Sequence, residues 1–204
     1  MKVVAVTQRV DQFSDRNETR DALDQRLINF VQDAGFIPLP VPNGLYKALP
    51  EGNDHTGLKQ WVANVNPEAF VLSGGNDIGK CIERDLTESW LLDYASLQQL
   101  PVLGICRGMQ MLAHWAGGGL HPVHGHVKSR HRISGKINAE VNSYHGFSLT
   151  TCPSEFEVLA YSDDKEIEAI RHQSLPWEGW MWHPEREEIF CLRDLQRIKA
   201  LFVG

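Results

Sequence analysis

One cysteine in this sequence lies in a setting that favours chemistry. Cys106 is the centre of Gly104-Ile105-Cys106-Arg107-Gly108, which joins a short apolar stretch to a helical one. This is the thiol counterpart of the Gly-x-Ser-x-Gly elbow, where a sharp strand-to-helix turn strains the nucleophile's backbone. A helix N-terminus favours a thiolate, and Arg107 adds positive charge beside it. A buried, unreactive cysteine is the competing interpretation of this pentapeptide alone.

A reactive thiol needs a base, and the base needs a group that orients it. His183 and Glu185 flank Pro184 directly after a predicted strand. In an extended segment, residues two apart project to the same side, so both side chains are expected to converge on one point. Together with the elbow, this pair predicts a triad of Cys106, His183 and Glu185.

Acyl transfer also requires donors for the developing oxyanion. Ser73-Gly74-Gly75 follows a predicted strand, at the edge where open parallel sheets bind ligands. Glycines allow backbone N–H groups to approach a substrate closely. We expect one donor from the amide of Gly75 and another from that of Arg107, the residue after the nucleophile. An ordinary glycine turn is the alternative for the tripeptide.

Five histidines crowd one region and raise the question of a metal site. They are His114, His121, His124, His126 and His131. The sequence shows no cysteine or carboxylate cluster beside them, and a cysteine nucleophile needs no metal. We therefore expect neither a metal site nor a cofactor. The other cysteines have no metal-binding or redox spacing and are expected to be free thiols; they are Cys81, Cys152 and Cys191.

These motifs resemble those of the class I glutamine amidotransferases, and among them the stand-alone γ-glutamyl hydrolases. The resemblance rests on residues 73–77, 104–110 and 183–185, in that order along the chain. It implies that a small-molecule γ-glutamyl amide is the substrate, that Cys106 forms a γ-glutamyl thioester and that His183 transfers the proton. It also implies residues that hold the glutamyl group: Gly74, Gln110, Asn142, Ser143, Tyr144 and His145.

The N-terminal stretches 7–9 and 18–24 resemble a bacterial branch of this family. Its members release glutamate and a cytidine diphosphoramidate that is used to decorate capsular sugars. Arginine forks suit a diphosphate leaving group. We therefore expect Arg9 and Arg20, with Arg16 close by, to contact substrate. The alternative is that these arginines pair with neighbouring carboxylates on a solvated helix face.

The elements that must position these residues follow from the apolar pattern. Buried, strand-like segments alternate with amphipathic ones in the first half, which is typical of a parallel sheet covered by helices. We predict one α/β domain over residues 1–204: a flavodoxin-like, mostly parallel sheet flanked by helices, with extra short antiparallel strands in the second half. Predicted strands are 3–7, 36–41, 69–72, 102–105, 127–133, 136–141, 157–161, 166–171 and 178–182; predicted helices are 20–34, 58–65, 87–100, 107–116 and 193–203.

Composition argues against several kinds of partner. The net charge of −6 gives no electrostatic case for binding nucleic acid or an anionic membrane. No apolar run approaches the ~18 residues that a membrane span requires. The apolar start of the chain is too short for a signal-peptide core, so a cytoplasmic location is expected.

Three other functions are compatible with the same residues. The chain could be a glutaminase subunit that delivers ammonia to a separate synthetase, a cysteine peptidase, or a non-catalytic γ-glutamyl-binding protein. The sequence also leaves open the identity of the amine leaving group and whether the protein forms a homodimer.

Overall fold

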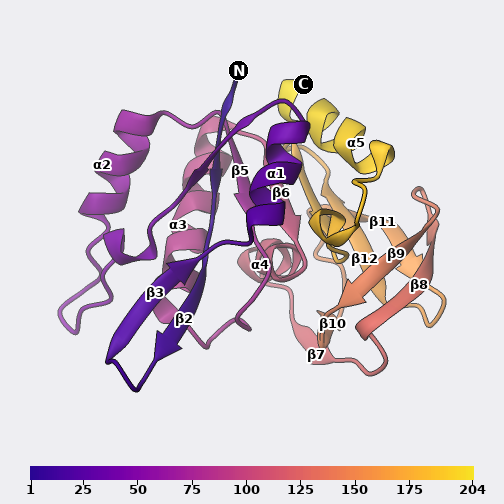
Figure 1. Cartoon of the computed structure of the whole chain (residues 1–204), viewed down its shortest axis with the longest axis horizontal. Coiled ribbons are helices and arrows are strands. Elements are labelled where there is room, and N and C mark those ends of the chain that lie inside the picture. The colour runs from indigo at the N-terminus through magenta and orange to yellow at the C-terminus, as the bar shows by residue number, and fades with distance from the viewer.

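A computed structural model describes all residues from 1 to 204. A nine-stranded sheet runs through the molecule in the order β4-β1-β5-β6-β13-β12-β11-β8-β9, and β2–β3 and β7–β10 form two small separate pairs (Figure 1). The strands are β1 (Val3–Val6), β2 (Arg9–Phe13), β3 (Glu18–Ala22), β4 (Ile37–Pro40), β5 (Ala69–Leu72), β6 (Val102–Ile105), β7 (Leu120–Pro122), β8 (Val127–Gly135), β9 (Ala139–Tyr144), β10 (Phe147–Leu149), β11 (Phe156–Ser162), β12 (Ile167–His172) and β13 (Trp177–Trp180). The helices are α1 (Gln25–Asp33), α2 (Thr56–Val65), α3 (Ile82–Gln98), α4 (Arg107–Trp115) and α5 (Leu192–Val203), with short 3₁₀ turns η1 (Asn43–Leu45) and η2 (Pro184–Arg186).

The first five strands of the sheet order run parallel. Every residue of β5 and β6 is buried, as expected for strands covered on both faces. Side chains alternate between two apolar cores: Val4 and Val6 pack with α1 and α5, whereas Ala5 packs with α2, α3 and α4. The predicted α/β fold is confirmed. None of its helices is both long and apolar enough to cross a bilayer.

β13 marks the boundary between two halves of the sheet. It pairs in parallel with β6 on one side and antiparallel with β12 on the other. Beyond it, β12, β11, β8 and β9 continue antiparallel and extend the same sheet. The predicted antiparallel strands of the second half are thus confirmed. β7 and β10 were not predicted, because three-residue strands are too short to show an apolar alternation.

The helix predicted over 20–34 is wrong in its first part. β2 and β3 form an antiparallel hairpin there, and α1 begins only at Gln25. The Asp24 carboxylate accepts the amide of Arg26 at 2.9 Å and so caps the helix. From Leu27 onward the predicted apolar spacing does form the buried face of α1.

Two further boundaries differ from prediction and matter for function. α3 begins at Ile82 instead of residue 87, so its first turns carry charged side chains into the interior. β13 ends at Trp180, and the chain then bends into η2 instead of staying extended to residue 182.

Candidate active site

Cys106 lies between β6 and α4, where the chain turns sharply. Its backbone has φ +52° and ψ −106°, a strained conformation for a residue with a side chain. The turn is so tight that a methyl group on Gly108 would lie 2.1 Å from the Leu72 carbonyl oxygen, and one on Gly104 would lie 2.5 Å from the backbone of Gly108. The prediction of a strained elbow between obligatory glycines is confirmed.

The pairing of β6 with β13 brings His183 toward Cys106. Trp180 lies opposite Ile105, and the Cys106 amide donates to the Trp180 carbonyl at 2.7 Å. The His183 Nδ1 atom is 2.6 Å from the Glu185 Oε1 atom. This convergence was predicted, but its stated reason was wrong. Glu185 reaches the imidazole because η2 folds it back, not because the segment is extended.

The buried imidazole of His183 is surrounded by negative charge. Burial lowers the pKa of His183, but the charges of Cys106 and Glu185, and hydrogen bonds with both, raise that pKa to about 9 overall. The imidazole therefore keeps its proton at neutral pH. This arrangement can hold the thiolate–imidazolium pair on which cysteine nucleophiles depend.

Two neighbours fix the position of His183. The Asn142 side chain donates to the His183 carbonyl at 2.8 Å and accepts the His183 amide at 2.9 Å. Gly74 packs directly against the ring, since a methyl group there would lie 2.7 Å from Cε1. Asn142 was expected to bind substrate, but both polar groups of its side chain are engaged with the backbone of His183.

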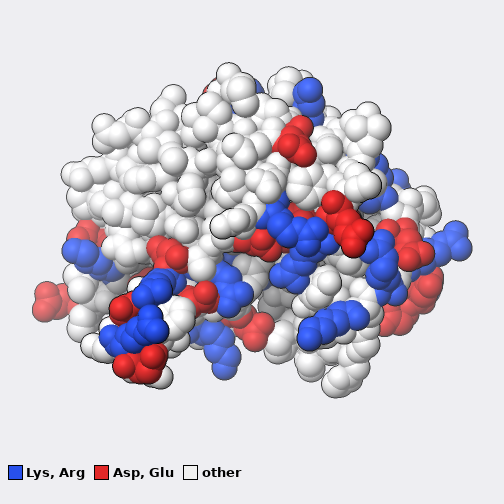
Figure 2. Space-filling view, viewed as in Figure 1, with Lys and Arg blue, Asp and Glu red and all other residues white.

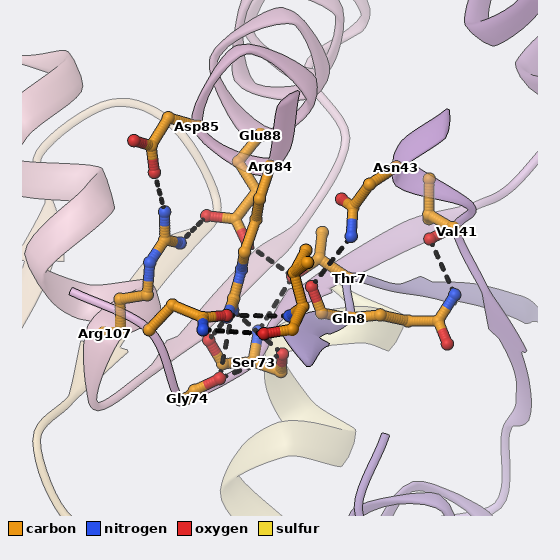
Figure 3. Close-up of polar contacts among 12 residues, drawn as sticks. Thr7, Gln8, Val41, Asn43, Ser73, Gly74, Arg84, Asp85, Glu88 and Arg107 are labelled. Atoms are coloured by element: carbon orange, nitrogen blue, oxygen red, sulfur yellow. Dashed lines mark hydrogen bonds and ion pairs between the residues drawn. The ribbon is translucent and has the colours of Figure 1, made fainter. Parts of the chain in front are cut away.

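A buried ion network holds the Ser73-Gly74-Gly75 loop (Figure 3). The Arg84 guanidinium donates to the first two carbonyls of the loop at 2.7 and 3.0 Å. Arg84 also pairs with Glu88, whose carboxylate accepts the Thr7 hydroxyl at 2.7 Å. That hydroxyl in turn accepts the Ser73 amide at 3.0 Å. The network thereby ties the end of β5 to the end of β1 and to α3.

The Arg107 side chain completes this network. It pairs with Asp85 and Glu88. The expectation that its charge assists the thiolate stays a prediction, and two carboxylates compensate that charge here. Its backbone amide, at the first position of α4, has no acceptor within the helix. The amide of Gly75, at φ +93°, has no backbone acceptor either, so both predicted oxyanion donors are free.

A small pocket of about 80 Å³ lies beside the imidazole. The glycine loop, η2, the start of α1 and Arg9 form its walls. It opens along the carboxyl edge of the parallel strands, where Figure 2 shows side chains of both charges gathered in a band. Arg20 and Arg16 do not line it: Arg20 pairs with Glu18, and Arg16 pairs with Asp15. They do so on a hairpin and not on the helix face envisaged from the sequence.

The other expected substrate residues point in different directions. The Tyr144 ring is partly exposed and lies edge-on to His183, with centroids 5.7 Å apart. Gln110, one turn along α4 from the thiol, donates to the Phe147 carbonyl at 3.0 Å. Ser143 and His145 are buried and do not line the pocket. Only Tyr144 of this segment therefore offers exposed surface next to the imidazole.

The crowded histidines do have a carboxylate beside them, contrary to expectation. Glu168, on β12, lies within 3.5 Å of ring nitrogens of His126, His131 and His145. The remaining three do not join this group. His121 pairs with Glu166, and His114 and His124 are exposed.

A comparison with known protein families matches residues 49–188 to the class-I glutamine amidotransferase family, which is more than half of the chain. The chain belongs to that family. Among curated relatives of this amidotransferase, the γ-glutamyl-CDP-amidate hydrolase of Campylobacter jejuni is 30% identical over 98% of this chain and 96% of its own length. A glutamine-hydrolysing GMP synthase subunit of Methanothrix thermoacetophila is 32% identical over 61% of this chain and 70% of its own.

Solved structures support the amidotransferase fold. A putative GMP synthase subunit from Thermoplasma acidophilum superimposes with a TM-score of 0.75, covering 100% of this chain and 94% of that one, at 19% identity. A glutamine amidotransferase from Thermotoga maritima gives a TM-score of 0.61, covering 99% of this chain and 82% of that one, at 16% identity. At such identities the likeness concerns the fold alone.

Sequence reasoning missed several residues that shape this amidotransferase site. Thr7 was treated as the end of a strand, and its link to Glu88 depends on a contact 81 residues away. Asn76 bonds both backbone groups of Val10 and so holds the hairpin against the glycine loop. Glu168 left one signal in the sequence, because it is a charged residue between the apolar residues Ile167 and Ala169 of one strand.

Proposed function

We propose that this protein hydrolyses γ-glutamyl amides, with Cys106 as nucleophile, His183 as acid and base, and Glu185 as the group that orients His183. One observation carries the proposal: a buried imidazole with a pKa raised to about 9 lies between a carboxylate 2.6 Å away and a thiol on a strained elbow. A cysteine that only filled the core would need neither the strain nor the buried partner.

In the first step the Cys106 sulfur forms a bond to the γ-carbon, and the carbonyl electrons move onto oxygen. The free amides of Gly75 and Arg107 stabilise that oxyanion. The C–N bond then breaks, and the departing nitrogen takes the proton of His183. A γ-glutamyl thioester and a neutral imidazole remain.

In the second step His183 removes a proton from a water molecule, and the oxygen of that water attacks the carbonyl carbon of the thioester. The C–S bond breaks, glutamate leaves, and the thiolate–imidazolium pair is restored. Glu185 stabilises the imidazolium in both steps and keeps Nδ1 protonated. Burst release of the amine product would indicate that the second step limits turnover.

Our specific proposal for the substrate is γ-glutamyl-CDP-amidate, giving glutamate and cytidine diphosphoramidate. The C. jejuni hydrolase supports it because that similarity spans nearly the whole chain, including the hairpin that carries Arg9. Arg9 lines the pocket and its side chain is half exposed, but its guanidinium pairs with Asp11 at 2.6 Å, so a diphosphate would bind it by taking the place of that carboxylate.

A second candidate is a glutaminase subunit that supplies ammonia to a separate synthetase. The similarity to the glutamine-hydrolysing subunits of GMP synthases favours it, although the curated matches span about two thirds of this chain. Such a protein would use the same thiol chemistry on glutamine. The two candidates differ in the leaving group and in the need for a partner.

The test offers γ-glutamyl-CDP-amidate and glutamine to the purified protein in parallel and measures glutamate release. We expect a much larger kcat/KM for the nucleotide-linked substrate. Arg9→Gln should raise KM for that substrate while leaving glutamine hydrolysis unchanged. Arg16→Gln, an exposed arginine on the same hairpin outside the pocket, is the matched control. Preference for glutamine, and stimulation by a synthetase, would support the second candidate instead.

A further inference from the structure

Three histidines surround one buried carboxylate on the antiparallel side of the sheet. The Glu168 Oε1 atom is 3.2 Å from His131 Nε2, 3.3 Å from His145 Nε2 and 3.5 Å from His126 Nδ1. The His126 and His145 nitrogens lie 3.1 Å from each other. The Glu168 and His145 side chains are fully buried, and the His126 side chain nearly so, whereas 15% of the His131 side chain is exposed and gives a route to solvent.

The outer nitrogens of two of these rings are already committed as donors. His145 Nδ1 lies 3.0 Å from the Phe147 carbonyl oxygen, and His126 Nε2 lies 2.9 Å from an Asp164 carboxylate oxygen. Both partners can only accept, so both outer nitrogens carry hydrogen. In the neutral imidazoles the inner nitrogens then carry lone pairs, and these point at each other and at Glu168.

This arrangement leaves buried acceptors without a donor. Neither oxygen of Glu168 has a hydrogen-bond partner of good geometry, and His131 Nε2 has none either. Buried polar atoms without partners cost free energy, and a native structure usually satisfies them with an unseen water, proton or ion. What is missing here is a positive centre that accepts several lone pairs.

We propose that His126, His131, His145 and Glu168 bind a divalent transition-metal ion of the zinc class. Metal–ligand bonds of about 2.0–2.1 Å in a tetrahedron place neighbouring ligand atoms about 3.3 Å apart. The separations given above are four of the six edges of such a tetrahedron, and they scatter around that value. The offered atoms of His126, His131 and Glu168 all lie within 4.8 Å of one another. Imidazole ligands select zinc-like ions over Mg²⁺ and Ca²⁺, which take oxygen ligands.

The second layer of contacts has the form that metal sites require. A ligating histidine donates its other ring N–H to a carboxylate or a backbone carbonyl, which fixes the orientation of the ring. Asp164 serves His126 in this way, and the Phe147 carbonyl serves His145. These partners already hold both rings in the tautomer that a metal ion needs.

Four protein ligands leave no open position, so the ion is structural and not catalytic. It joins the hairpin of β8 and β9 to β12, which follows more than 20 residues later in the sequence. β9 also carries Asn142 and Tyr144, which contact His183. The Phe147 carbonyl that orients His145 also accepts Gln110, which lies one turn along α4 from the thiol. The ion would therefore stiffen the wall behind the proposed active site.

The test measures metal binding directly and does not depend on turnover. The protein carries Cys106→Ala, which removes the thiol of the proposed active site, and is freed of metal with a chelator. Zn²⁺ is then titrated in competition with a chromophoric chelator, and Co²⁺ is added separately to record its absorption spectrum. We expect one Zn²⁺ per chain, and for Co²⁺ the intense visible bands of four-coordinate geometry without a thiolate charge-transfer band.

Variants locate the site. His131→Asn should weaken Zn²⁺ binding by about 100-fold or more, and Asp164→Asn, which removes only an orienting partner, by about tenfold. His124→Asn, an exposed histidine next to the cluster, is the matched control and should bind as the parent does. Equal binding by parent and His131→Asn, or no four-coordinate Co²⁺ spectrum in the parent, would overturn the proposal. The missing Co²⁺ spectrum would mean that the histidine cluster binds protons and no metal ion. Because this measurement uses the parent protein, it remains decisive even if a variant fails to fold.

Discussion

Two buried clusters of charge lie in the two halves of the sheet, and they are built differently. Beside the parallel strands, Arg84 and Arg107 face Asp85 and Glu88, so that two positive charges meet two negative ones. Beside the antiparallel strands, Glu168 faces three histidine rings, and the outer nitrogens of two of them, His126 and His145, are committed elsewhere. The first cluster is balanced within the chain; the second has acceptors left over.

This difference in charge balance distinguishes a structural support, the arginine cluster, from a proposed binding site, the histidine cluster. A buried charge is tolerated when a partner of opposite sign and hydrogen bonds compensate its lost hydration. The arginine cluster meets this condition, and its outward contacts go to the carbonyls of the glycine loop. The histidine cluster meets it only with a further positive charge. Balance, more than burial, indicates which of the two receives a ligand.

The proposed active site lies in the parallel half, and removing its thiol should have the largest effect. Cys106→Ala should lower kcat by about 10⁴-fold or more while leaving the fold intact, because no other group can form the thioester. Steady-state kinetics and circular dichroism check both parts. Cys152→Ala, at a half-buried thiol whose pKa burial raises to about 11, is the control and should stay active. Normal turnover by Cys106→Ala would refute the triad.

Breaking the balanced cluster should be the largest perturbation of stability. Glu88→Gln leaves two buried guanidinium groups without their shared carboxylate and should lower the free energy of unfolding by about 3–5 kcal/mol. Urea unfolding measures this change. Glu157→Gln, which removes a surface pair with Lys136, should unfold as the parent does. Equal stability of the two variants would mean that the buried network is not a support.

Two adjacent residues of β9 contact His183 and the histidine cluster respectively, so they sharpen the comparison. Asn142→Ala should lower kcat by about 100-fold with little change in KM, because His183 loses both contacts that position it. Ser143→Ala removes a buried hydroxyl that donates to the His126 carbonyl at 2.6 Å, and it should retain nearly full kcat. Similar losses in both variants would show that β9 acts as one unit.

The smallest expected effect is on pH dependence. The pKa of His183 is raised to about 9, so the imidazole is protonated below that pH and loses its proton as pH rises through it. The kcat/KM should therefore fall above about pH 9, approaching tenfold per pH unit. In Cys106→Ala the negative charge that helps to raise this pKa is gone, and NMR should find His183 titrating at lower pH. An unchanged pKa of His183 in this variant would show that the Cys106 side chain does not interact electrostatically with His183.

The local parts of this architecture were predictable from sequence. Gly104 and Gly108 mark the elbow because the turn leaves no room for a side chain, and that constraint acts over five residues. The parallel strands β5 and β6 were equally clear, since strands buried on both faces are apolar throughout. The β2–β3 hairpin was missed because Leu23 lies at a position that extends the apolar spacing of α1 toward the N-terminus. The helix itself begins only after its cap, Asp24.

Contacts across long sequence separations were not predictable. Glu168 meets His126 across 42 positions only because β12 and β8 lie in one sheet with β11 between them. The roles of Asn142 and Ser143 depend on which face of β9 each occupies, and a register shift by one residue would exchange them. The resemblance pointed to residues 142–145, but strand pairing decided which of their side chains lie near His183.

The position of β13 in the sheet has a consequence for how the protein matures. Its residues 177–180 come well after β6 in the chain, yet they lie between β6 and β12 at the middle of the sheet. When the ribosome has added Cys106 to the growing chain, β13, which pairs with β6, and His183, which follows β13, have not yet been synthesised. The thiol of Cys106 consequently has no neighbouring His183 until β13 and η2 have been synthesised, so the proposed nucleophile and base come together only late in synthesis.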